Sequence, residues 1–135
     1  MTENGLTTLA SAHSAKETMD RLEAAVKAKG LTVFARIDHA AGAKADGLTL
    51  RPTEVLIFGN AQGGTPLMQA LQTAGIDLPL KVLVWEDPGG KAWLSYNEPA
   101  WIARRHGGEQ VSEQVSEVTG RLAAVLAALA KAATA

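Results

Sequence analysis

Residues 78–97 read LPLKVLVWEDPGGKAWLSYN, and this stretch decides the fold. Two apolar runs, LPLKVLVWE and AWLSYN, flank a short segment that is rich in proline and glycine. Two strands joined by such a short turn pair side by side as an antiparallel hairpin. The stretch therefore predicts a sheet with antiparallel pairing, in which Trp85 and Trp93 are neighbours across the two strands.

Three more strands are predicted before this hairpin. Residues 5–11 are the first, and residues 55–58 are continuously apolar, which is typical of a strand buried on both faces. Residues 31–38, LTVFARID, alternate between apolar and polar side chains, which predicts a strand with one buried face. On that face we expect Leu31, Val33, Ala35 and Ile37.

Helices are predicted between the strands. Ser14 and Glu17 have the spacing of a capping box, and Gly30 is a suitable C-terminal stop, so a helix is expected between them. The pattern as a whole predicts one α+β domain, a largely antiparallel sheet of about five strands with helices packed on it. Further helices are predicted within residues 39–48, from an N-cap at Thr65 with Pro66 in the first turn up to Gly75, and from an N-cap at Asn97 up to Gly107.

The C-terminal segment carries a heptad pattern. Two interpretations are open: an amphipathic helix docked on its own sheet, or a helix that packs against its copy in a second subunit. We therefore divide the chain into an α+β core at residues 1–108 and an amphipathic helix at residues 109–135. The apolar positions, spaced by four and three residues, are Val111, Val115, Val118, Leu122, Val125 and Leu129.

Composition narrows the functional classes. The 135 residues include 13 basic and 14 acidic ones, for a net charge of −1, so no concentrated basic surface for nucleic acid is expected. Without cysteine there is no disulfide and no thiolate nucleophile. The N-terminus lacks the pattern of a signal peptide and the alanine-rich C-terminus is interrupted by charges, so we expect no membrane span and a soluble, cytoplasmic protein.

Residues 56–68, LIFGNAQGGTPLM, have the order strand, glycine-rich loop and helix start that many phosphate-binding sites share. The named nucleotide motifs are absent, because no Lys follows the last glycine and the three spaced glycines of the dinucleotide fingerprint are missing. Two interpretations stay open: a well-formed turn tied by Asn60, or a loop whose free N–H groups contact a ligand.

The segments GLTVFARIDHAAGAKADGLTLRPTEVLIFGN, GTPLM, LPLKVLVWED and WLSYNEPAWIARRHG resemble, in order and spacing, the family called domain of unknown function 302. The resemblance runs from about Ser14 to Gly107 and leaves the C-terminal helix outside. The family usually has proline after the loop asparagine, where this chain has Ala61. The resemblance implies an α+β fold with a largely antiparallel sheet, often in a dimer, and no settled activity. It also implies an association with c-type cytochromes and with haem binding.

His39 and His106 fall where the family pattern also has histidine, so the resemblance makes them candidate metal ligands of haem b. The alternative for each is a histidine that bonds to backbone, or a general base. Asn60 and Trp101 are the other candidate cofactor-binding residues; the aromatic side chains between 85 and 101 are either core or the wall of a pocket. No His-x-x-x-His pair or G-x-S-x-G motif is present, and no catalytic residue can be named.

Three functional hypotheses follow. The first is a dimeric module that binds a small ligand or cofactor, with haem b as the named candidate and a histidine as axial ligand. The second is an interaction or assembly domain that acts through its dimer surface and C-terminal helix. The third is an enzyme that uses a histidine as acid or base on an unknown substrate.

Overall fold

The computed structural model describes residues 4–135, and within them one five-stranded sheet organises the chain. All neighbouring strands are antiparallel, in the order β1-β5-β4-β3-β2, so the predicted fold class is confirmed. The predicted hairpin is present as well, with Trp85 opposite Trp93. The strands are β1 (Leu6–Ala10), β2 (Thr32–Asp38), β3 (Thr53–Gly59), β4 (Leu80–Glu86) and β5 (Ala92–Asn97).

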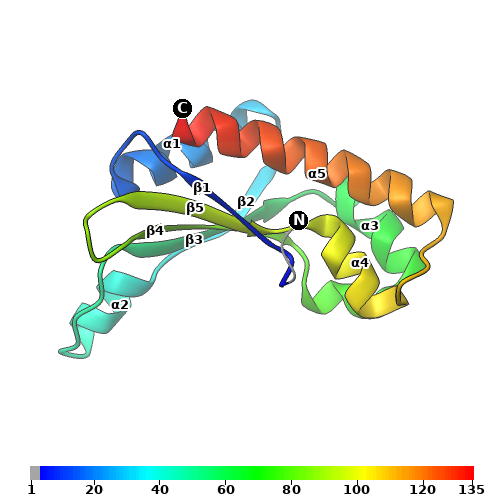
Figure 1. Ribbon diagram of the computed structural model, residues 1–135, viewed down its shortest axis with the longest axis horizontal. Coiled ribbons are helices and arrows are strands. Elements are labelled where there is room, and N and C mark those ends of the chain that lie inside the picture. The colour runs from blue at the N-terminus through cyan, green and yellow to red at the C-terminus, as the bar shows by residue number, and fades with distance from the viewer. Residues whose placement is uncertain (1–3) are drawn as a thin grey trace.

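Two long helices, α1 (Ala15–Ala28) and α5 (Glu113–Thr134), lie together over one face of the sheet (Figure 1). Two others, α3 (Ala61–Ala70) and α4 (Pro99–Gly107), lie at one end of the sheet beside the start of α5, with a short 3-10 helix, η1 (Gln72–Ile76), between α3 and β4. Helix α2 (His39–Ala45) projects from the opposite end and buries none of its residues.

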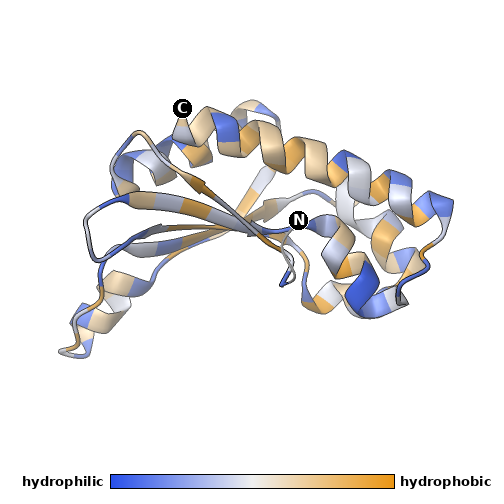
Figure 2. Cartoon of the chain, viewed as in Figure 1, coloured by the Kyte–Doolittle hydropathy of each residue, from blue (hydrophilic) through white to orange (hydrophobic). Residues whose placement is uncertain are grey.

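The core fills the space between the sheet and the two long helices. In β4, Val82 and Val84 are 1% exposed, because alternate residues of a strand point to the same face. Helix α1 meets them with residues at helical spacing, and Ser14 caps it as predicted by accepting a hydrogen bond from the Glu17 N–H. Figure 2 shows the matching apolar side of α5 turned towards the sheet. The fully buried apolar residues of α1 are Met19, Leu22 and Val26.

The predicted alternation of β2 is wrong after Val33. A β-bulge at Phe34 shifts the register, so that Val33 lies opposite Phe58 and Ala35 lies opposite Ile57. One extra residue in a strand moves every later side chain to the other face. Ile37, expected in the core, is 42% exposed on the open face of the sheet.

Two helix starts also differ from the prediction. Helix α3 begins at Ala61 rather than at Thr65, because Asn60 is its N-cap and accepts a 2.7 Å hydrogen bond from the Gly63 N–H. Pro66 consequently lies inside the helix. Asn97 remains paired in β5, so Glu98 is the N-cap residue of α4, and it makes no side-chain capping bond.

Helix α5 is docked within its own chain. It packs on α1, α3 and α4 and reaches β1 and β5, so the first interpretation of the heptad pattern describes this structure. The predicted division after residue 108 falls in the connection between α4 and α5, but both parts share one hydrophobic core. Between residues 4 and 135, no helix combines the length and the apolar character that crossing a bilayer requires. Buried on α5 are Val115, Val118, Leu122, Leu126 and Leu129.

Candidate ligand-binding cleft

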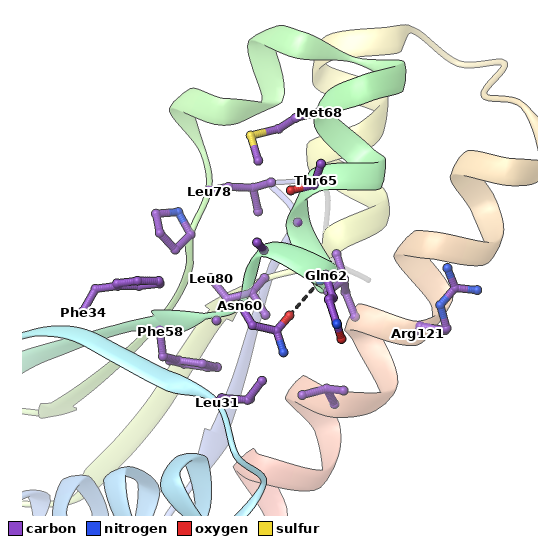
Figure 3. A pocket seen from close by; sticks show the side chains of 17 residues that line it. Leu31, Phe34, Phe58, Asn60, Gln62, Thr65, Met68, Leu78, Leu80 and Arg121 are labelled. Carbon is purple, nitrogen blue, oxygen red and sulfur yellow. Dashed lines mark hydrogen bonds between the residues drawn. The ribbon is translucent and has the colours of Figure 1, made fainter.

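A cleft of about 600 Å³ opens where the β3–α3 connection meets β4 and α5 (Figure 3). Its floor includes Phe58, which is fully buried, and Leu122, which is 8% exposed. Met68 and Leu78 form the wall on the side of α3 and η1. The 56–68 stretch therefore lines a concave apolar surface, which supports the ligand-contacting interpretation of the loop.

Phe34 belongs to this cleft because of the bulge. It is the extra residue of β2, and its ring stands at the mouth of the cleft, 55% exposed (Figure 3). Bulges often re-aim a side chain next to a functional site. An apolar ligand that enters the cavity would cover this exposed aromatic ring and remove its apolar surface from water.

The polar side of the cleft is formed by the first turn of α3 and by α5. Asn60 uses its Oδ1 for the cap, so its Nδ2 group remains available as a donor. Gln62 follows in the first turn of α3, and Arg121 stands at the rim on α5 (Figure 3). Thr65, farther along α3, lies beside Met68 and Leu78. Each of these four side chains is exposed.

Two glycines in the first turn of α3 face α5 and the η1–β4 connection. A Cβ on Gly63 would stand 3.1 Å from Asn60 Oδ1 and 3.5 Å from a methyl of Leu122. A Cβ on Gly64 would stand 3.7 Å from Leu78 and from Met68. Only the approach of Asn60 Oδ1 to Gly63 is tighter than an ordinary van der Waals contact, so a side chain at Gly63 would press on the capping oxygen.

His39 does not reach this cleft. It is the first residue of α2, it is exposed, and α2 lies at the opposite end of the sheet (Figure 1). Its neighbour Asp38 caps α2 by accepting a 2.9 Å hydrogen bond from the Ala41 N–H.

His106 lies in the last turn of α4 with 9% of its side chain exposed, and both of its ring nitrogens are occupied. Nε2 lies 2.6 Å from Asp77 Oδ2, and Nδ1 lies 2.8 Å from Thr73 Oγ1. Arg105 bonds to the same carboxylate. Burial alone would raise the pKa of Asp77, but the hydrogen bond from His106 and the charge of Arg105 outweigh it and hold that pKa below its usual range. The hydrogen bonds of His106 and Arg105 to Thr73 and Asp77 thus join α4 to η1 and the residue that follows it.

These positions do not fit a histidine-ligated haem. An axial imidazole needs a free nitrogen facing an apolar slot. His106 has no free nitrogen, and His39 is exposed and lines neither the cleft nor the concave region beneath α2. Within residues 4–135, no three His, Asp or Glu side chains are grouped as a metal site would require.

Trp101, the remaining candidate, lies on α4 away from the cleft. Its ring covers Gly5, where an added Cβ would clash with the indole, and Arg105 lies over the ring at 5.9 Å from its centroid. The packing interpretation therefore describes Trp101. Of the four candidate cofactor-binding residues, the structure places Asn60 alone at the cleft.

A second concave region, of about 640 Å³, lies beneath α2. Most of its charged groups already have partners: Arg36 holds Glu54 at 2.6 Å, Lys16 pairs with Asp20, and Asp38 caps α2. Because these polar groups are already satisfied, this region is the weaker candidate for a ligand site.

The chain belongs to the family described as domain of unknown function DUF302, which it matches over residues 7–129. The match extends through most of α5, so our expectation that the C-terminal helix lies outside the family is wrong. A crystal structure of an uncharacterised conserved DUF302 protein from Bacillus stearothermophilus has the same fold, with a TM-score of 0.82 and 20% sequence identity. The structural alignment covers 96% of this chain and 98% of that chain.

Curated relatives are similar to most of this chain. A protein named fluoride-specific ion channel FluC 1 from Brucella suis is 55% identical over 104 residues, which are 77% of this chain and 41% of that protein. A protein of the same name from Brucella abortus is also 55% identical over 104 residues, which are 38% of its length. The chain thus spans about two fifths of the curated relatives it matches.

Proposed function

Starting from this family membership, which assigns no activity, we propose that the chain is a binding domain for small, largely apolar molecules, and that the cleft beside Asn60 is its site. The observation that carries the proposal is a cavity of about 600 Å³ lined mainly by apolar side chains with a few polar groups at one side. Small-molecule sites in proteins typically have this size and composition.

The surroundings of the cleft support the same function. Its floor is part of the packed core, since Phe58 and Leu80 are buried, so the shape of the site is held by rigid elements. The side chains that face a ligand, such as Phe34 and Gln62, are exposed and free to adjust. A preformed apolar floor with adaptable rim residues suits reversible binding of a small molecule.

The proposal is tested by titrating the ¹⁵N-labelled protein with 4-phenylbutan-1-ol, a neutral apolar probe. We expect saturable shifts of the amide signals of Gly59, Gly63 and Gly64. Val125→Trp places a large ring in the cleft and should abolish the shifts, because Val125 lines it. Ala128→Trp is the matched control, since Ala128 is exposed on the same helix, and it should bind as the wild type does.

The proposal would be overturned by saturable shifts confined to distant signals such as those of Gly47 and Gly90, or by full binding to the Val125→Trp variant. Haemin serves as a second probe. A saturable Soret change that is lost in His39→Ala or His106→Ala, but not in Val125→Trp, would assign a haem function outside the cleft.

Fluoride is a further probe, because the curated relatives are named fluoride-specific ion channels. Their channel activity belongs to proteins more than twice as long as the matched segment. Sodium fluoride is compared with sodium chloride at equal ionic strength. Shifts at Gly63 and Gly64 that appear with fluoride alone would make the cleft an anion site rather than an apolar one.

A second function, assembly into a homodimer, is supported by the open face of the sheet. On the face opposite the long helices, Ile37, Val55 and Leu83 form one cross-strand row, and Ile37 is 42% exposed. Leu6, 37% exposed, lies on the same face. We infer that a second copy covers this apolar surface, and light scattering should then give twice the chain mass of 14.1 kDa.

A further inference from the structure

We propose that the cleft selects amphipathic carboxylates, with the carboxylate at the side of Asn60 and Arg121 and the apolar body towards Phe34 and Met68. The inference rests on the proposed binding function and adds the chemical class of the ligand. It is carried by the charge and the hydrogen-bonding capacity of the groups that line the cavity.

The lining carries one positive charge and no negative one. Arg121 is the single ionisable residue among the 17 that line the cleft. Among residues 4–135 it has no ion pair or hydrogen-bond partner, and Glu117, one helical turn earlier, is not within ion-pair distance of it. Arg36 and Arg105, in contrast, are both paired with carboxylates. The cleft therefore holds an uncompensated cation at its rim.

The available hydrogen-bonding groups on this side can donate. Asn60 has committed its Oδ1 oxygen to the Gly63 N–H, which leaves the two N–H bonds of Nδ2 for a ligand. Figure 3 shows this nitrogen on the side facing Phe58 and α5. Gln62 can donate as well. A carboxylate accepts at both oxygens and donates nothing, so it matches these groups better than an alcohol or an amine does.

The opposite part of the cleft is mainly apolar. Phe34, Met68 and Leu78 gather there, on the side away from Arg121, and Thr65 lies beside Met68 and Leu78 (Figure 3). Pro79 also lines the cleft. A simple inorganic anion would leave this apolar surface exposed to water. An anion with a hydrocarbon or aromatic body covers it, and the burial of apolar area adds to the affinity.

The test compares three probes that share one body and differ in the head group: 4-phenylbutyrate, 4-phenylbutan-1-ol and 4-phenylbutylamine. Dissociation constants are measured at pH 7 from the amide shifts of Gly63 and Gly64. We expect the carboxylate to bind roughly fivefold more tightly than the alcohol, the factor that an exposed ion pair provides, and the amine to bind most weakly. Arg121→Gln should remove most of this preference. Lys131→Gln, which removes the same charge from the same helix ten residues later, should keep it.

Asn60→Asp separates the head-group contact from the helix cap. Aspartate caps a helix as well as asparagine does, so stability should be unchanged, while the loss of the donor and the added charge should reverse the preference for the carboxylate. Equal binding of carboxylate and alcohol to the wild type would overturn the carboxylate inference and leave the binding function intact. Failure of all three probes to bind would overturn the binding function itself.

Discussion

Arg36 joins three elements of the fold through its guanidinium group. It contacts Asp20 and Glu23 of α1 at 2.9 Å each, and Glu54 of β3 at 2.6 Å. The bulge at Phe34 places Arg36 on the helix-covered face, where a regular strand would have placed Ala35 or Ile37. With 26% of its side chain exposed, the arginine lies between three carboxylates that would repel one another without it.

Replacing Arg36 by methionine should lower the free energy of unfolding at pH 7 by about 2 kcal/mol, between the values typical of exposed and of buried ion pairs. Urea unfolding measures the change. Lys16→Met is the control: Lys16 pairs with Asp20 but is 82% exposed, so a change within about 0.5 kcal/mol is expected. An equal effect of the two substitutions would show that Arg36 is an ordinary surface residue.

The same cluster predicts a pH dependence. Hydrogen bonds from Arg36, and then from Lys27, hold the pKa of Glu23 below its ordinary value of 4.5. A carboxyl whose pKa is lower in the folded state stabilises the fold above the ordinary value, and the contribution is lost as the pH falls through the folded value. The Arg36→Met variant should therefore lose less stability than the wild type between pH 5 and pH 3, which is followed by urea unfolding at both pH values.

At the scale of elements, α5 is a part of the core rather than an appendage. Val118 is 4% exposed and faces the body of its own chain. Val118→Asp should therefore destabilise the fold by about 3 kcal/mol or more, because it buries an unpaired charge. Ser116→Asp, two residues earlier and exposed, should change the stability by less than about 0.5 kcal/mol. Thermal unfolding compares the two. If the Val118→Asp variant kept the melting temperature of the wild type but differed from it in the assembly mass measured by light scattering, α5 would instead lie between subunits.

Elements that depend only on a local sequence pattern could be predicted from the sequence. Features that depend on which of two similar residues the packing selects could not. The hairpin around residues 87–91 needs only a turn between two apolar runs. Asn60 and Thr65 are both good N-caps, and which one starts α3 depends on its packing against α5. The bulge at Phe34 adds a residue to β2, and the alternation of apolar and polar side chains in the sequence gives no sign of it.

The cleft could not be predicted from the sequence for a related reason. Its lining comes from four separate parts of the chain, at residues 31–34, 58–68, 78–80 and 121–125. The loop pattern points to Asn60, whereas Arg121 occupies an ordinary polar position of an amphipathic helix. The signal that could have found it is its heptad position beside Leu122, the residue that faces α3.

At the scale of the whole molecule, the two faces of the sheet are unequal. The helices bury one face, and the other carries a half-exposed apolar row at Ile37, Val55 and Leu83 beside the stacked pair Trp85 and Trp93. An open sheet face of this character is typical of an interface. Helix α2, with no buried residue, projects from the end of the sheet where β4 turns into β5 (Figure 1), and Trp85 and Trp93 face each other near this turn.

If a second copy covers this face, a charge at its centre should separate the subunits without unfolding them. Leu83→Asp places a carboxylate in the middle of the row, where a dimer would bury it unpaired and a monomer would leave it in water. Light scattering should then fall from twice the chain mass to the mass of one chain, while the circular dichroism spectrum stays unchanged. Ala24→Asp, on the exposed side of α1, should keep the dimer mass. A wild type that already scatters as a single chain would leave the open face without this partner, and the cleft would remain the one proposed site of interaction.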